Sequence, residues 1–148
     1  MLSTPLQKMM SYVSRFGQYA AELIKAINSG GLYGGGAVIP KATSYTVLAT
    51  ENGAQYNTFG ASGAVTFTLP TIALGLSYTF VNVVDQNMVI AFNSLGIADG
   101  SITAASATFS TSSHKRGSAA RVVAIDSDGE GTLKWLFQNI GGTTATIA

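Results

Sequence analysis

The chain has 148 residues, of which 10% are charged and 47% are hydrophobic, and its formal net charge is +1. This near-neutral balance excludes the clustered basic surface typical of a nucleic-acid-binding protein. Cysteine is absent, which excludes disulfides, thiolate chemistry and cysteine-based zinc sites. Charged residues usually make up about a quarter of a soluble domain. We therefore expect a surface of uncharged polar residues, part of which is buried against partners.

Membrane insertion and export leave no signal in the sequence. No apolar run approaches the roughly 18 residues that a membrane-spanning helix needs. Residues 1–5 lack the basic and apolar regions of a secretory signal peptide. We expect a protein that is made in a cytoplasm, is not exported and does not have a membrane as its partner.

Residues 4–28 give the strongest helix signal. Thr4 is a favourable N-cap, Pro5 suits the first helical position, and Gln7 completes a capping box with Thr4. The glycines at 30 and 31 end the helix.

The apolar residues of this predicted helix follow a heptad pattern, in which one set recurs every seven residues and a second set lies three residues after the first. The predicted assembly stripe is Leu6, Met9, Val13, Phe16, Ala20, Leu23 and Ile27. Such a stripe also fits an amphipathic helix packed on its own domain. The glycine-rich segment that follows favours association with other copies or docking on a partner, because a flexible linker separates the helix from the domain.

The remainder of the chain predicts short strands at a spacing of roughly ten residues. The expected strands are 44–49, 55–59, 65–69, 77–83, 88–92, 101–103, 107–110, 121–126 and 134–139. We predict a mainly β fold, a compact antiparallel β-sandwich or barrel resembling a jelly roll, preceded by one N-terminal α-helix. The predicted parts are the helix at 1–29, the linker at 30–40 and the all-β domain at 41–148.

Two segments predict hairpin turns, 85–87 and 128–131, because they contain Asp, Asn and Gly between predicted strands. The tail at 141–148 has strand-like residues after a glycine pair. We interpret it as an arm that adds to a neighbour's sheet or as a frayed end.

No set of residues predicts catalysis, a cofactor or a metal site, and we expect the protein not to be an enzyme. His114 is the single histidine and lies in a small basic segment, which predicts a solvated loop tip or a contact with an acidic surface. Residues 126–130 resemble half of a calcium loop, but a hairpin turn needs the same residue types. Trp135 is expected in the core rather than on a sugar-binding surface.

Residues 60–70, GASGAVTFTLP, and the following Gly75, Leu76, Tyr78 and Phe80 carry a family resemblance. This pattern resembles the small β domain of virion proteins from tailed bacteriophages, over residues 44 to about 140. The family includes head decoration (cement) proteins, head fibres and tail-fibre domains. The resemblance implies a homotrimer without catalytic residues. Residues 1–36 do not match the family's pattern.

These observations together predict a structural virion protein, a trimeric decoration or cement protein on a phage capsid, whose partners are its own copies and the major capsid protein or other virion proteins. One alternative is a head- or tail-fibre component that binds a host receptor. A second alternative is a carbohydrate-binding module. The expected location is the virion.

Overall fold

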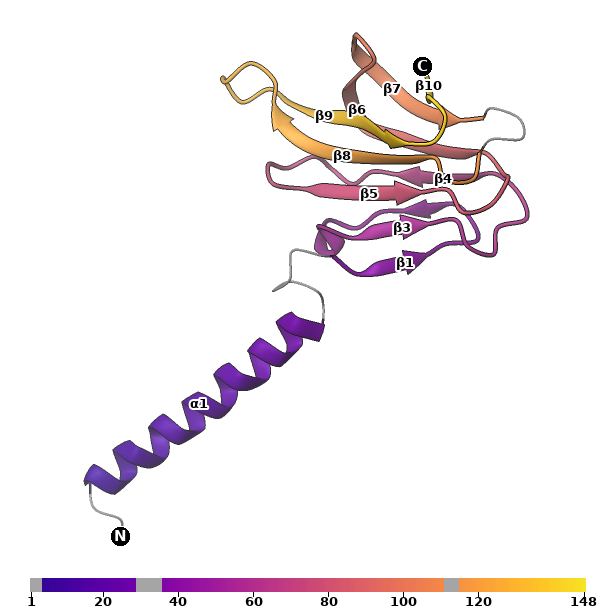
Figure 1. The fold of residues 1–148 in the computed structure, drawn as a ribbon. Helices are drawn as coiled ribbons and strands as arrows, with labels where there is room; N and C mark the ends of the chain where they lie inside the picture. The colour runs from indigo at the N-terminus through magenta and orange to yellow at the C-terminus, as the bar shows by residue number, and fades with distance from the viewer. Residues whose placement is uncertain (1–3, 29–35, 111–114) are drawn as a thin grey trace. The chain divides into compact units, whose positions relative to one another are not determined.

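The computed structural model describes residues 4–28, 36–110 and 115–148. The chain divides into two compact units, Met1–Gly35 and Gly36–Ala148, and each is treated by itself. The predicted fold class is confirmed: the chain is mainly β, with one N-terminal helix and a compact multi-stranded sheet (Figure 1).

The first unit contains helix α1, Thr4–Asn28. These bounds match the predicted span of 4–28. At 1.5 Å per residue, its 25 residues extend over about 37 Å. The apolar residues recur every three or four positions, which places them along one side of the helix.

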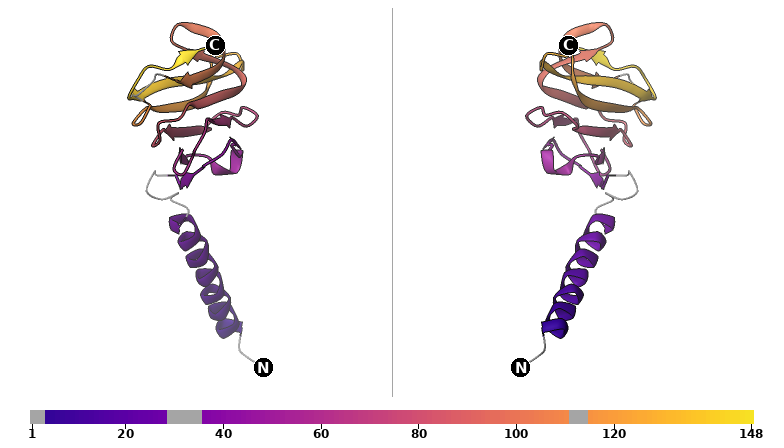
Figure 2. Two further views of the ribbon diagram at one scale, coloured as in Figure 1. Left: turned by 90° about the vertical axis from the view of Figure 1, so that its right-hand side faces the viewer. Right: turned by 90° about the vertical axis from the view of Figure 1, so that its left-hand side faces the viewer.

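The second unit begins with strands that alternate between two layers. One layer contains β1 (Val38–Pro40), β3 (Gln55–Asn57) and β5 (Ser77–Val81), which pair in parallel. The other layer contains β2 (Tyr45–Thr46), β4 (Val65–Thr68) and the first part of β6 (Met88–Ala98), also in parallel. The chain thus winds through successive coils that stack on one another (Figures 1 and 2).

The later strands join the two layers by antiparallel pairing. β7 (Ser101–Phe109) pairs with β6, and β8 (Ala119–Asp126) pairs with β5 and with β9 (Leu133–Gly141). β9 also pairs in parallel with the second part of β6, and the path β1-β3-β5-β8-β9-β6-β4-β2 therefore runs through both layers. The short strand β10 (Thr146–Ile147) adds to β7.

Aromatic side chains fill the space between the layers. Tyr56 of β3 lies 5.6 Å from Phe67 of β4, measured between ring centroids, and Phe67 lies 5.0 Å from Phe80 of β5. Tyr78 and Trp135 are 6.1 Å apart in the same core. Each fully buried side chain of this size stabilises the fold by about 2–3 kcal/mol. The predicted core position of Trp135 is confirmed, since it is fully buried.

The strand directions differ from the expected antiparallel arrangement. Five of the nine pairings among the described residues are parallel. Alternation of apolar and polar residues reports a half-buried strand but not the direction of its neighbour. The prediction of a hairpin at residues 85–87 fails for this reason: β5 and β6 are not paired, and the segment crosses between layers.

The linker boundary also needs correction. The sequence predicts a linker at 30–40, but β1 occupies residues 38–40 and the β unit begins at Gly36. A Cβ atom at Gly36 would overlap the backbone carbonyl of Gly53, so the close approach of these two backbone segments requires glycine. The expectations for residues 29–35 lie outside the described residues.

Two further expectations change at the C-terminal half. The sequence predicts separate strands at 101–103 and 107–110, but these residues belong to the single strand β7 and its end. The tail is neither a frayed end nor an exchanged arm in this structure, because the backbone N–H of Ala148 donates to the carbonyl of Ser106, 3.1 Å away on β7.

Candidate functional site: the exposed face of the N-terminal helix

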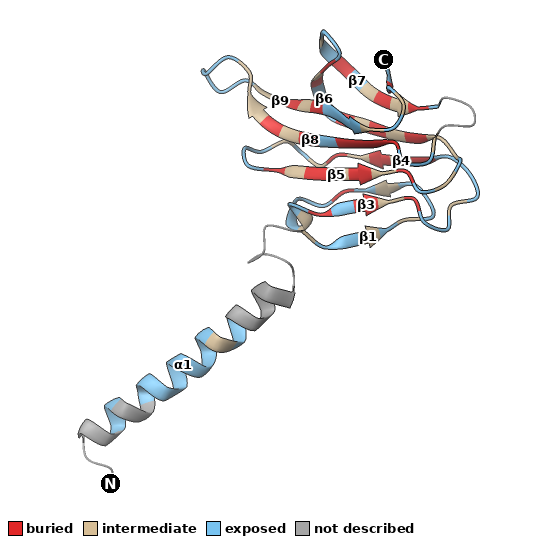
Figure 3. Cartoon of the chain, viewed as in Figure 1, coloured by how far each residue is buried: buried red, intermediate tan, exposed pale blue. Residues whose placement is uncertain are grey.

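The helix exposes large apolar and aromatic side chains along one side. Tyr12, Val13, Phe16 and Tyr19 are 65%, 67%, 74% and 73% exposed (Figure 3). Their spacing places them within one broad stripe on the helix surface. Contiguous apolar patches of this kind mark interaction surfaces in soluble proteins. A helix alone is marginal in water, so burial of this stripe is the main source of stabilisation open to it.

Charged residues border the stripe without entering it. Lys8, Arg15 and Glu22 are exposed and recur every seven residues, in a row beside the two tyrosines. The far side of the helix presents Ser11 and Gln18, which are also exposed. The helix therefore has one uncharged, apolar face and one polar face.

The structure describes the exposure of three of the seven residues in the predicted assembly stripe. Val13 and Phe16 lie exposed, as a contact surface requires, and Ala20 is half-buried. The side chains of Leu6, Met9, Leu23 and Ile27 lie outside the described residues. That these seven residues form an interface stays a prediction.

The β unit contains a hydrogen-bonded cluster around one carboxylate, Glu51, which the sequence patterns do not predict. Glu51 lies on a short 3₁₀ helix, η1 (Ala49–Glu51). Its Oε2 atom accepts hydrogen bonds from the hydroxyl of Tyr56 at 2.6 Å and from the backbone N–H of Leu48 at 3.1 Å. The hydroxyl of Tyr45 donates to Oε1 at 3.0 Å, and the ammonium of Lys41 lies 3.4 Å from the centre of the Tyr45 ring.

The environment of Glu51 keeps its carboxylate charged. Burial by itself raises the pKa of Glu51, but hydrogen bonds from Tyr56, Leu48 and Tyr45 outweigh it and lower the pKa from its ordinary value. Burial, together with the hydrogen bond to Glu51, raises the pKa of the Tyr56 hydroxyl. A carboxylate held by three donors fixes the chain around η1 and is poorly suited to accept a proton from a substrate.

A second polar network lies directly after the C-terminal ends of β3 and β5. The buried side chains of Thr58 and Asn82 are joined by a 2.6 Å hydrogen bond from the threonine hydroxyl to the asparagine carbonyl oxygen. The Asn82 amide also donates to the carbonyl of Gln86 at 2.7 Å. The alternation of apolar and polar residues could not identify Thr58 and Asn82, because a Thr or Asn after a strand is equally common in an exposed turn.

The segment compared with a calcium loop forms the predicted hairpin turn between β8 and β9. Asp126 accepts hydrogen bonds from the backbone N–H groups of Asp128, Gly129 and Gly131. Hydrogen bonds from Thr132 and from the backbone of Glu130 lower the pKa of Asp128 to about 2. Across the described ranges, no three metal-binding side chains gather at one point.

A surface depression is a further candidate among the described residues. A depression of about 170 Å³ is lined by Asp99, Phe137, Asn139, Thr144, Ala145 and Ile147. Small-molecule pockets are usually about 300–1,000 Å³, so this depression is small for a ligand. His114 lies outside the described residues, and of its basic neighbours Lys115 is half-buried and Arg116 is exposed.

Among the described residues, no helix is long and apolar enough to cross a membrane. No protein family matches the sequence, and no curated protein matches it.

Proposed function

We propose that this chain is a structural assembly protein of a virion, a homotrimeric decoration or cement protein that attaches to a phage capsid. The observation that carries the proposal is the exposed apolar face of α1, where Tyr12, Val13, Phe16 and Tyr19 are all more exposed than buried. A surface of this kind is stable in water when another protein surface covers it.

The features of the β unit support a structural role. Its core is filled by aromatic and aliphatic side chains from both layers. The hydrogen-bonded carboxylates of Glu51 and Asp126 face phenols and backbone N–H groups within the unit, which stabilise turns. The resemblance of residues 44–140 to phage virion β domains points to the same role.

Substitution of Phe16 by Asp tests the proposal. A charge at the centre of a buried seam costs several kcal/mol, so Phe16→Asp is expected to disrupt assembly through the helix and thereby to abolish attachment to capsids. Gln18→Asp is the matched control, because it adds the same charge on the polar side of the same helix. Co-sedimentation with capsids reports attachment, and circular dichroism reports the β fold.

The two variants separate the possible outcomes. Loss of attachment in Phe16→Asp with a preserved β spectrum, and normal attachment of Gln18→Asp, supports the proposal. Equal binding of both variants to capsids contradicts it. Unfolding of the β unit by Phe16→Asp means that the helix belongs to the core of that unit.

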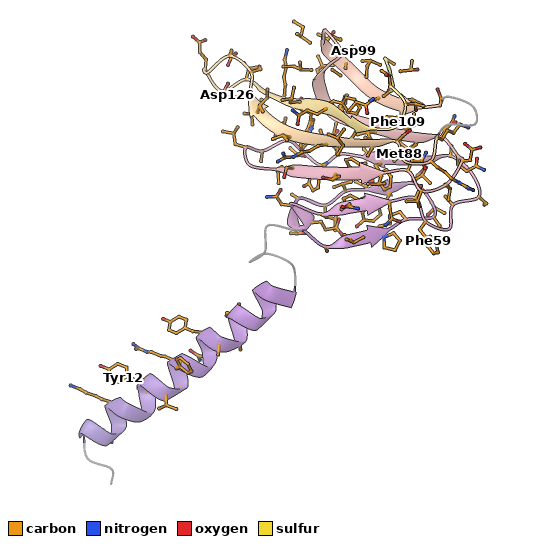
Figure 4. The ribbon with its side chains drawn as sticks, viewed as in Figure 1. Tyr12, Phe59, Met88, Asp99, Phe109 and Asp126 are labelled. Carbon is orange, nitrogen blue, oxygen red and sulfur yellow. The ribbon has the colours of Figure 1, made fainter. Side chains whose placement is uncertain are left out.

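One observation favours the fibre-type alternative, in which the β unit binds a host receptor. Phe59, in the loop after β3, is 72% exposed, and receptor-binding loops commonly present exposed aromatic residues (Figure 4). If this alternative holds, Phe59→Ala reduces adsorption of virions to host cells while leaving capsid attachment unchanged. If Phe59→Ala leaves adsorption unchanged, the alternative loses its support.

A further inference from the structure

A glycine lies at the middle of helix α1, where it is unfavourable. Gly17 is exposed, and a Cβ atom built on it would meet no other atom within 4 Å. Glycine in a helix interior lowers the helical population about five-fold relative to alanine. Nothing within the helix itself requires a glycine here, because an alanine side chain would enter open space.

The position of Gly17 in the heptad pattern supplies a reason for it. If Val13 and Ala20 occupy the first core position of the heptad and Phe16 the second, then Gly17 directly follows the core, and Tyr12 and Tyr19 directly precede it. In a parallel pair of helices, the residue that precedes the core on one helix faces the residue five positions later on its neighbour. Tyr12 of one copy therefore faces Gly17 of the next copy.

The two residues have complementary shapes. The Tyr12 ring extends from the helix and is 65% exposed, and the surface over Gly17 is open (Figure 4). A large flat ring can pack closely on a backbone that carries no side chain. Each copy carries both Tyr12 and Gly17. The contact can therefore repeat from copy to copy around a closed ring of parallel helices.

The charges of the helix favour another copy of this chain as the partner. All four charged residues, Lys8, Arg15, Glu22 and Lys25, fall outside the core positions and the positions that flank them. Parallel copies in register therefore bring together neutral surfaces, without burying an unpaired charge. A specific foreign partner is usually selected by complementary charges at these flanking positions, and this helix offers none.

We propose that α1 associates with other copies of itself as a parallel, in-register bundle, in which the Tyr12 ring sits in the gap above Gly17 of the neighbouring copy. The inference rests on the proposed assembly function and names the partner of its helix. Gly17 is a positioning residue that determines which face and which direction of the neighbouring helix can be accommodated.

Substitution of Gly17 by Ala in the full chain gives opposite results for the two roles of this residue. As an ordinary helix residue, alanine raises helicity and strengthens association. In the proposed arrangement, the methyl group displaces the Tyr12 ring, and the dissociation constant rises at least ten-fold although helicity is favoured. Ser14→Ala, on the polar side, is the control that raises helix propensity alone. Sedimentation velocity measures association, and far-ultraviolet circular dichroism measures helicity.

Cross-linking tests the direction and the contact without depending on stability. The native chain has no cysteine, so each introduced cysteine is unique. Val13→Cys is expected to form a disulfide between copies, because parallel register places residue 13 beside its own equivalent. A mixture of Tyr12→Cys and Gly17→Cys chains is expected to cross-link to each other more than a Ser14→Cys and Gly17→Cys mixture does.

These outcomes distinguish the inference from the function on which it rests. A monomeric full chain, or stronger association of Gly17→Ala than of wild type, overturns the inference. Cross-links absent at Val13→Cys overturn the parallel arrangement. If the wild type self-associates as described but does not bind capsids, the inference stands and the virion function falls.

Discussion

At the residue scale, the polar groups of the β unit hold neighbouring segments together by hydrogen bonds. Glu51 gathers two phenols and one backbone N–H around a single carboxylate. Asn82 joins the end of β5 to the segment before β6 by its side-chain amide and to Thr58 by its carbonyl oxygen. Hydrogen bonds to a charged group contribute about 1.5–3 kcal/mol each when protected from water, and less when exposed.

Replacement of Glu51 by Gln is expected to lower the free energy of unfolding at pH 7 by about 1 kcal/mol, discounted because the group is only partly buried. The pKa of Glu51 is lower in the folded chain than its ordinary value of 4.5. Its stabilisation is therefore present above about pH 4.5 and is lost as the pH falls through the lower folded value. Urea unfolding of both proteins at pH 7 and near pH 3 checks this.

The control for that comparison is Glu130→Gln, which changes an exposed glutamate in the β8–β9 turn. Its effect should stay within about 0.5 kcal/mol at both pH values. A stability difference between wild type and Glu51→Gln that persists unchanged at pH 3 would mean that the charge of Glu51 is not the source of the stabilisation.

At the scale of elements, the β unit combines two kinds of connection. β1 to β6 are joined by segments that cross between layers, and each strand pairs with a strand one coil away. β8 and β9 are joined by a local hairpin, whose turn is held by the carboxylate of Asp126. The conformation of this turn therefore depends on that carboxylate, whereas the two strands are also held by their packing in the core.

Asp126→Ala is expected to lower the free energy of unfolding by about 1 kcal/mol, because backbone N–H groups of the turn lose their acceptor. Asp126→Asn retains one carbonyl oxygen as an acceptor and should lose less. The midpoint of thermal unfolding, measured with and without EDTA, is expected to be the same for the wild type. A midpoint that falls by many degrees with EDTA would reveal a bound metal ion at this turn.

At the scale of the whole molecule, the two units differ in what they need. The β unit encloses its own core, from Val47 near its start to Ala145 near its end. Among the described side chains of the helix, all but Ala20 are exposed, including Phe16 and Tyr19, so they form no core by themselves. Folding of the β unit and assembly of the protein are therefore expected to be separable.

A chain beginning at Gly36 is expected to retain the β spectrum and to unfold cooperatively, but to have the mass of a monomer. The full chain is expected to have the mass of a trimer under the same conditions. Light scattering at micromolar concentration distinguishes the two masses. A trimeric fragment would place the assembly surface on the β unit instead, in keeping with its sparse surface charge.

The sequence by itself determined the features that depend on local periodicity and on turn chemistry. The bounds of α1 followed from its caps and its apolar spacing, and the β8–β9 hairpin followed from Asp and Gly between two strand patterns. The buried position of Trp135 followed from its apolar neighbours. These features are encoded within a few residues, so they can be read without the fold.

Only the tertiary structure decided how the strands pair and which polar residues meet. The alternation in β4 and β5 is the same whether a neighbour runs parallel or antiparallel, so it left the winding of the coils undetermined. Glu51 and Tyr45 come together because the chain turns back over η1, and the tail pairs with β7 through contacts far apart in sequence. Such contacts depend on the packing of the whole unit, which local sequence patterns do not record.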